Sequence, residues 1–298
     1  MVAAAFFFSV MTLLVKMAGA RLPNQEIVLV RGVLTLAFSW VMVRRAGVTS
    51  RGGRPLMLMA RGLFGYASLS CLYYAVVHLP LADATVLQYT NPVWTSLLAA
   101  WLLDEHMRPA EVLLVLGSLL GVVVMARPSF LFGAGAGRLD LFAVGVALAG
   151  ATMSAAAYVM VRKLSRTEHP LTIVYYFTLV TVPAAIPGTI AVALWPTPRE
   201  WLLLLGVGMA AQAGQLYLTS GLRLEPAGRA TAAGYMQVVF AAALGAIFFR
   251  ELPDAWVLAG AAIILGSTLL LARLHAGHVA PAPAADEAGM EAIRPENR

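Results

Sequence analysis

The chain has 298 residues, of which 60% are hydrophobic and only 12% are charged. A soluble domain carries about 25% charged residues, so a soluble protein of this size would leave much apolar surface in water, and the surplus must face lipid. The net charge of +6 then indicates basic loop residues that orient helices in a membrane, rather than a nucleic-acid partner.

Ten apolar runs follow one another along the chain, each long enough for a helix that crosses a hydrocarbon core of about 30 Å. They lack the alternation of a lipid-facing barrel strand, so the prediction is an all-α membrane protein. No basic segment precedes the first run, and we interpret it as the first helix rather than a signal peptide. The predicted spans are residues 2–20, 25–44, 55–77, 82–103, 110–127, 139–161, 172–194, 200–223, 228–250 and 255–273.

An internal repeat divides these spans into two sets of five. A shift of 146 positions, without a gap, superposes Gly62 on Gly208, Pro80 on Pro226, Tyr89 on Tyr235 and Glu105 on Glu251. Because five is odd, the second half must enter the membrane from the opposite side. We therefore expect two inverted five-helix repeats at 1–127 and 139–273, a connecting loop at 128–138, and a disordered cytoplasmic tail at 274–298.

The distribution of basic residues predicts the same inversion. The loop after the span 25–44 carries Arg44, Arg45, Arg51 and Arg54, whereas the matched loop after 172–194 carries only Arg199. Cytoplasmic loops are enriched in Lys and Arg, so this bias places both termini in the cytoplasm. Arg127 and Arg138 lie in a loop predicted to be external, and they weaken the bias without reversing it.

Several kinds of chemistry have no motif in this sequence. There is no G-x-x-x-x-G-K-[ST] phosphate loop, no H-E-x-x-H pair and no clustered His/Cys/Asp set, so we expect no cofactor or metal and no enzyme. The one cysteine, Cys71, cannot form an internal disulfide. No acidic residue lies deep in a span as an obvious proton carrier, which favours a facilitator or exchanger over a proton-coupled pump.

Polar and aromatic side chains in the middles of the spans are the candidate substrate ligands. They are costly in lipid unless they are paired or face a wet cavity, and inverted-repeat transporters bind near the midplane. The alternative is that they bridge helices and line nothing. The candidates are Tyr66, Ser70, Tyr74, Gln88, Asn91, Trp94, Tyr158, Gln212, Gln215, Tyr235 and Gln237, of which Asn91, Gln212 and Gln215 lie deepest.

Two further residues inside spans have more than one interpretation. Arg31 can bind a carboxylate or phosphate of a substrate, pair within the bundle, or reach the outer headgroups. Pro92 removes a backbone hydrogen bond, and the resulting kink can expose a carbonyl to a cavity, act as a hinge, or merely accommodate packing. Its repeat partner is Val238, so the kink need not recur in the second half.

Two other patterns concern helix ends and helix contacts. Glu105 and Glu251 end matched spans and are expected to tie those ends to the next helix. Gly117 and Gly121 form a GxxxG pair, which indicates close packing within the chain or, alternatively, a dimer interface.

Four stretches resemble the drug/metabolite transporter superfamily, specifically its EamA-type ten-helix branch. They are EIVLVRG (26–32), LADATVLQYTNPVWTSLLAAWLLDE (81–105), ARPSFLFG (126–133) and YMQVVFAAALGAIFFRELPD (235–254). Many members carry a proline before a valine in both matched helices, but this chain keeps Pro92 and has Gln237 in the second half. The resemblance implies alternating access around a central cavity without fixing the substrate.

These observations lead to one functional hypothesis with two alternatives. The hypothesis is a secondary transporter of small organic metabolites, amino acids or related amphipathic compounds, working in the cytoplasmic membrane as an exporter or exchanger. One alternative is an uptake carrier for S-adenosylmethionine, riboflavin or carboxylates. The other is a non-transporting membrane scaffold. The expected partners are the substrate and lipid, and the chain is expected to be a monomer or homodimer.

Overall fold

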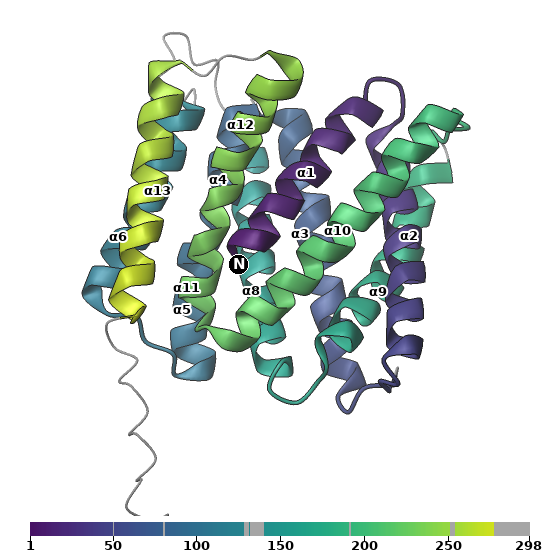
Figure 1. Ribbon diagram of the computed structural model, residues 1–298, viewed down its shortest axis with the longest axis horizontal. Helices are drawn as coiled ribbons and strands as arrows, with labels where there is room; N and C mark the ends of the chain where they lie inside the picture. The colour runs from purple at the N-terminus through teal and green to yellow at the C-terminus, as the bar shows by residue number, and fades with distance from the viewer. Residues whose placement is uncertain are drawn as a thin grey trace, which may run out of the picture.

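The structure is a computed structural model that describes residues 1–49, 51–79, 81–127, 131, 140–190, 192–250 and 254–276. The described elements are all helical (Figure 1). The predicted loop at 128–138 lies outside the described residues except for Leu131, as does the predicted tail from residue 277 onward. The helices are α1 (Val2–Ala18), α2 (Asn24–Arg45), α3 (Pro55–His78), α4 (Leu81–Gln88), α5 (Asn91–Leu103), α6 (Pro109–Ala126), α8 (Leu141–Leu164), α9 (Pro170–Ile190), α10 (Pro198–Leu224), α11 (Ala227–Ala232), the 3₁₀ turn η1 (Ala233–Tyr235), α12 (Met236–Phe249) and α13 (Ala255–Ala276).

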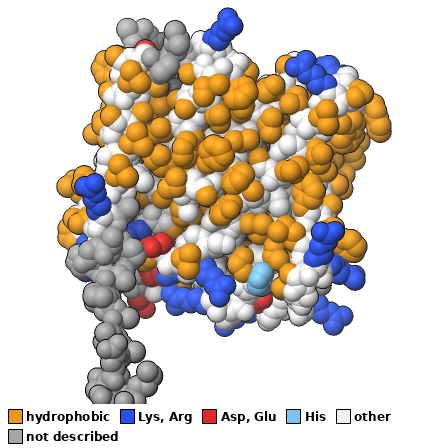
Figure 2. All heavy atoms as spheres, viewed as in Figure 1, with side chains coloured by type: hydrophobic (Ala, Val, Ile, Leu, Met, Phe, Trp, Pro, Cys, Tyr) orange, Lys and Arg blue, Asp and Glu red, His pale blue; other side chains and the backbone are white. Residues whose placement is uncertain are grey.

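The outside of the bundle is apolar. Seven described segments are long and apolar enough to cross a membrane, and α1 together with Ala255–Leu271 adds two shorter apolar helices. Figure 2 shows hydrophobic side chains over the middle of the molecule and Lys and Arg gathered toward its two ends, most densely the lower one. Trp101, with 78% of its surface exposed, is one of many large apolar residues that point outward. The chain is therefore a multi-pass membrane protein.

The two spans predicted at 82–103 and 228–250 are each broken near the middle. In the first half, α4 ends at Gln88 and α5 begins at Asn91, because Pro92 has no N–H to continue the ladder. In the second half, η1 interrupts the helix, and the Met236 N–H bonds to the carbonyls of Ala233 and Gly234.

An interruption of the helix therefore does recur in the second half, although no proline stands there. The break at Tyr235 is 146 residues from that at Tyr89, and the Tyr235 hydroxyl donates to the Tyr89 carbonyl oxygen at 3.0 Å. Tyr235 is fully buried, and the preceding Gly234 is a poor helix former. A buried tyrosine and a glycine thus stand at the second break, without a proline.

Other features repeat at the same spacing. Asp104 ends α5 and Arg250 ends α12, both in the left-handed conformation, with φ of 54° and 56°. The helix contacts also correspond between the two halves. Helix α1 packs on α10, and their repeat partners α8 and α3 pack on each other (Figure 1). Helices α2 and α9 are repeat partners that pack together, as are α6 and α13.

The GxxxG pair in α6 is used inside the chain. A Cβ on Gly121 would come within 2.9 Å of the Gly260 carbonyl oxygen, and one on Gly117 within 2.9 Å of the Ser267 hydroxyl. Both glycines therefore let α6 and α13 approach closely.

Candidate functional site

A cavity of about 210 Å³ lies between the two halves of the chain. Helices α1, α2, α3 and α4 supply one part of its wall, and α8, α9, α10 and α12 supply the other. Its apolar lining includes Phe8, Leu72 and Phe177. The polar side chains in the wall are Arg31, Arg61, Ser68, Gln88, Ser154, Tyr158, Gln215 and Gln237.

A second cavity of about 70 Å³ adjoins the first, because Phe8, Tyr158, Leu218 and Gln237 line both. Its wall also contains the helix break of the first half, with Tyr89, Asn91 and Pro92, and Gly234 from the break of the second. The two helix breaks thus meet beside the central cavity.

Six of the sequence-predicted residues line one or both of these cavities. Gln88 lines the central cavity, and its buried Oε1 atom has no hydrogen-bond partner. Arg31 lies beside Met11, whose sulfur is 3.6 Å from its Nη1. The six are Arg31, Gln88, Asn91, Tyr158, Gln215 and Gln237, with Pro92 beside Asn91.

The remaining predicted residues lie outside both cavities and bond to neighbouring helices or to their own. Gln212 is buried between α10 and α2, where its Oε1 accepts from the Ser39 hydroxyl at 3.1 Å. Tyr66 bridges α3 and α9 by donating to the Ala184 carbonyl at 2.7 Å. Ser70 bonds to the Tyr66 carbonyl, Tyr74 stacks on His78, Trp94 donates to Thr90, and Tyr235 donates to Tyr89.

Arg61 is a cavity residue that the sequence analysis did not select. Only 3% of its surface is exposed. Its Nη2 lies 3.3 Å from Gln215 Oε1, and its Cζ lies 4.0 Å from the centre of the Phe177 ring. Nε and Nη1 are buried and have no hydrogen-bond partner. A charge within a predicted span is a signal of function, and that signal was available in the sequence.

Gly65 makes the position of Arg61 possible. It lies one turn after Arg61 on α3, and a Cβ there would come within 2.8 Å of Phe177 Cε2 and 3.3 Å of Arg61 Nη1. The missing side chain therefore lets the guanidinium lie along the helix with the aromatic ring against it, an arrangement stabilised by the attraction of a cation to a ring face.

The cavity wall carries positive charge. Its lining residues include Arg31 and Arg61, and none of the described lining residues is Asp or Glu. Across the described part of the chain, no group of three or more His, Cys, Asp or Glu side chains is arranged to hold a metal ion. What the wall offers to a ligand is therefore cationic N–H donors, amides and hydroxyls.

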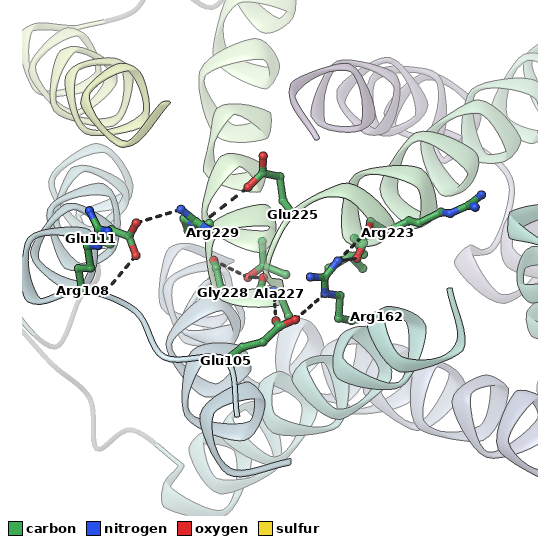
Figure 3. Close-up of polar contacts among 11 residues, drawn as sticks. Glu105, Arg108, Glu111, Arg162, Arg223, Glu225, Ala227, Gly228 and Arg229 are labelled. Atoms are coloured by element: carbon green, nitrogen blue, oxygen red, sulfur yellow. Dashed lines mark hydrogen bonds and ion pairs between the residues drawn. The ribbon is translucent and has the colours of Figure 1, made fainter. Parts of the chain in front are cut away.

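A polar network lies at one end of the bundle, near the α8–α9 and α10–α11 connections (Figures 1 and 3). Glu105, with 12% of its side chain exposed, accepts from Arg162 Nε at 2.7 Å and from the Ala227 N–H at 2.9 Å. Arg162 also donates to the Arg223 carbonyl at the end of α10. We expected Glu105 to tie one helix to the next, and these bonds instead join the first half to the second.

A second group of charges extends this network. Glu111 at the start of α6 accepts from Arg229 at 3.0 Å, and Arg229 faces Glu225 at 3.9 Å (Figure 3). The matched residue Glu251 lies outside the described residues.

The opposite end is held by more exposed contacts. Arg127 pairs with Asp254 at 2.7 Å, and both side chains are more than two-fifths exposed. The hydrogen bond from the Val257 N–H, aided by Arg127, holds the pKa of the Asp254 carboxyl below its usual range. Lys16, the repeat partner of Arg162, lies over the Phe249 ring at 4.3 Å. Among the described ion pairs, those in which both side chains are mostly buried thus lie at the end that carries Glu105, since the arginine of the Arg21–Glu200 pair is 46% exposed.

Several known proteins with similar sequences are named as transporters, exporters or solute carriers. The sequence pattern of the EamA-like transporter family matches residues 1–127 and 141–273. The pseudopaline exporter CntI of Pseudomonas aeruginosa (strain UCBPP-PA14) is 38% identical, over 93% of this chain and 95% of that protein. Human solute carrier family 35 member G1 is 30% identical, over 89% and 75%. The S-adenosylmethionine uptake transporter of Rickettsia prowazekii is 26% identical, over 86% and 85%.

A solved crystal structure shares the fold. It superposes with a TM-score of 0.78 over 92% of this chain and 97% of its own, at 22% sequence identity.

Proposed function

Because the chain belongs to the EamA-like transporter family, we propose that it exports small organic metabolites, such as amino acids or related amphipathic compounds, across the cytoplasmic membrane. The family and the named relatives are transporters, so the chain is a transporter and not an enzyme. The observation that carries the proposal is the central cavity, which gathers polar side chains from both halves inside a bundle with an apolar exterior. Export is favoured because the chain is more similar to the Pseudomonas exporter than to the Rickettsia uptake transporter.

The substrate is bound, in this proposal, by the six predicted residues that line the cavities and by Arg61. A cavity of mainly apolar walls with a few convergent polar groups suits a small amphipathic ligand. Gln215 is central to this set, because its side chain lies in the wall and contacts Arg61.

The two halves, 1–127 and 139–273, act as inverted repeats that rock against each other. Support comes from the matched helix breaks, the exchanged helix contacts and the separate family match to each half. Alternating access in such repeats exposes a fixed site to each side in turn. In this proposal the Glu105 network closes the cytoplasmic end and must break when that end opens. The basic loops at that end support a cytoplasmic location of both termini.

Counterflow in proteoliposomes tests the proposal. Vesicles holding purified protein are preloaded with an unlabelled amino acid, S-adenosylmethionine, riboflavin, or a di- or tricarboxylate, and uptake of the same labelled compound is measured. We expect protein-dependent uptake for at least one compound. Gln215→Leu should abolish it, whereas Gln212→Leu, the same change three residues earlier on α10 but outside the cavity, should retain it.

The outcomes separate the candidate functions. A scaffold predicts no counterflow from folded wild-type protein with any compound. Counterflow that survives Gln215→Leu would reject the central cavity as the route. Export and uptake are then distinguished in cells, because loss of an exporter raises the internal level of the identified substrate and loss of an uptake carrier lowers it.

A further inference from the structure

The guanidinium of Arg61 is buried in the cavity wall with part of its hydrogen-bonding capacity unused. Gln215 Oε1 accepts from Nη2, but Nε and Nη1 have no partner. The residues that line the cavity and are described include no carboxylate to neutralise it. A buried cation without an anion is costly in a membrane, so its presence calls for a compensating negative charge.

Its surroundings hold the group in place while leaving those N–H groups unused. Phe177 covers one face of the guanidinium at 4.0 Å, and Gly65 leaves the space in which it lies. A planar, immobilised guanidinium recognises a carboxylate through charge-assisted hydrogen bonds, and less entropy is lost on binding than with a mobile lysine.

A second unused group in the same wall has the opposite polarity. Gln88 Oε1 is buried and accepts no hydrogen bond. A ligand that carried both a carboxylate and an N–H or O–H donor would satisfy Arg61 and Gln88 together. Because Arg61 is buried and no described lining residue is a carboxylate, the field at this part of the wall favours a ligand whose net charge is negative.

We infer that Arg61 binds a carboxylate of the transported substrate and selects anionic organic acids, with an amino or hydroxyl donor directed to Gln88. This inference rests on the proposed transport function and narrows it. It disfavours net cationic substrates such as S-adenosylmethionine, because the buried Arg61 places a positive charge in the cavity wall.

The test measures binding separately from transport. Thermal unfolding of purified protein in detergent is recorded with succinate or L-malate, each compared with its uncharged diamide, succinamide or L-malamide. A ligand that binds the folded state raises the unfolding temperature. The acids should stabilise the wild type, and the amides should require about tenfold to a hundredfold higher concentration for the same shift.

Two variants assign the effect to Arg61. Arg61→Gln should remove the shift caused by the acids while leaving the unliganded protein at least as stable, because a buried charge has been removed. Arg54→Gln, an equal change of charge just before the same helix at an exposed site, should leave the shift unchanged. A structural role for Arg61 predicts instead that Arg61→Gln lowers the unfolding temperature without altering ligand preference.

The outcomes for binding and for transport are independent. Acid-selective stabilisation that Arg61→Gln abolishes supports carboxylate recognition by Arg61, and a failure of counterflow would then count against the transport function alone. Equal shifts with acids and amides, no shift with either acid, or an unchanged shift in Arg61→Gln would overturn the inference, even if counterflow succeeds.

Discussion

Two glutamines one turn apart on α10 have different environments. Gln212 accepts from Ser39 and has its amide next to the Met42 sulfur, so it joins α10 to α2. Gln215 instead lies in the cavity wall against Arg61. From the sequence alone, both glutamines lie deep in a predicted span and are equally good candidates for binding a substrate. Only the neighbours supplied by α2 and α3 separate a helix-bridging amide from a cavity amide.

Replacing Gly65 with alanine should disturb the site without disturbing the fold elsewhere. The new Cβ would meet Phe177 at 2.8 Å and Arg61 Nη1 at 3.3 Å, so the ring and the guanidinium must both move. We expect Gly65→Ala to lower substrate counterflow at least tenfold. Gly145→Ala on α8, where a Cβ would meet nothing within 4 Å, should keep wild-type flux, and equal flux in the two variants would reject this packing role.

Arg61 shows why the candidate site was only partly predictable. It stands about two turns into α3, on the side where Arg44, Arg45, Arg51 and Arg54 mark a basic loop. An arginine at that distance can reach water by snorkelling. Arg61 is covered by Phe177, which lies 116 positions later in the sequence. No local sequence pattern predicts a contact over that separation.

The broken helices are the elements that position the cavities. Pro92 predicts the first break from covalent geometry, and the structure has it. A tertiary contact accompanies the second break, where the buried Tyr235 hydroxyl donates to the Tyr89 carbonyl in the other half. The sequence repeat aligned these two tyrosines but did not indicate that they touch. The first break thus follows from local covalent geometry, whereas the second is accompanied by a long-range contact.

Removing the Tyr235 hydroxyl should weaken the crossing bond, the contact between the two helix breaks. Tyr235→Phe leaves the Tyr89 carbonyl without its donor in a buried place, which we expect to cost about 1–3 kcal/mol of stability. The unfolding temperature in detergent measures the loss. Tyr217→Phe, at a half-exposed tyrosine on α10, is the control, and equal stability of the two variants would mean that the crossing bond contributes nothing.

The Glu105 network should control access to the cytoplasmic end. Glu105→Gln leaves Arg162 and Arg166 without their carboxylate partner, so the closed arrangement loses stability. We expect a cysteine placed at Thr231, which lines the small cavity, to react several-fold faster with a thiol reagent in this variant. Cys71→Ser removes the single native thiol from the background.

A matched change at the other end provides the control for that experiment. Asp254→Asn removes the carboxylate that pairs with Arg127, and it should not speed the reaction at position 231. Acceleration by Asp254→Asn, or none by Glu105→Gln, would contradict the assignment of Glu105 to the cytoplasmic closure.

At the scale of the whole molecule, composition and periodicity were sufficient for the fold class. Apolar runs of membrane-spanning length predicted the helices, and their bounds differ from the structure by only a few residues. The resemblance to the EamA-type branch is confirmed by the family match across the chain. The substrate was not predictable in the same way, because it depends on which few side chains converge on one cavity, and related folds carry different sites.

The most direct measurement of the central claim is counterflow before and after chemical modification of the cavity. Ser154 lies in its wall, and Ser154→Cys in the Cys71→Ser background gives one reactive site there. Ser70→Cys, exposed and outside both cavities, is the matched control. We predict that a small methanethiosulfonate reagent stops counterflow in Ser154→Cys, that substrate slows this inactivation, and that the control keeps its flux. Undiminished counterflow with position 154 fully modified would contradict transport through this cavity.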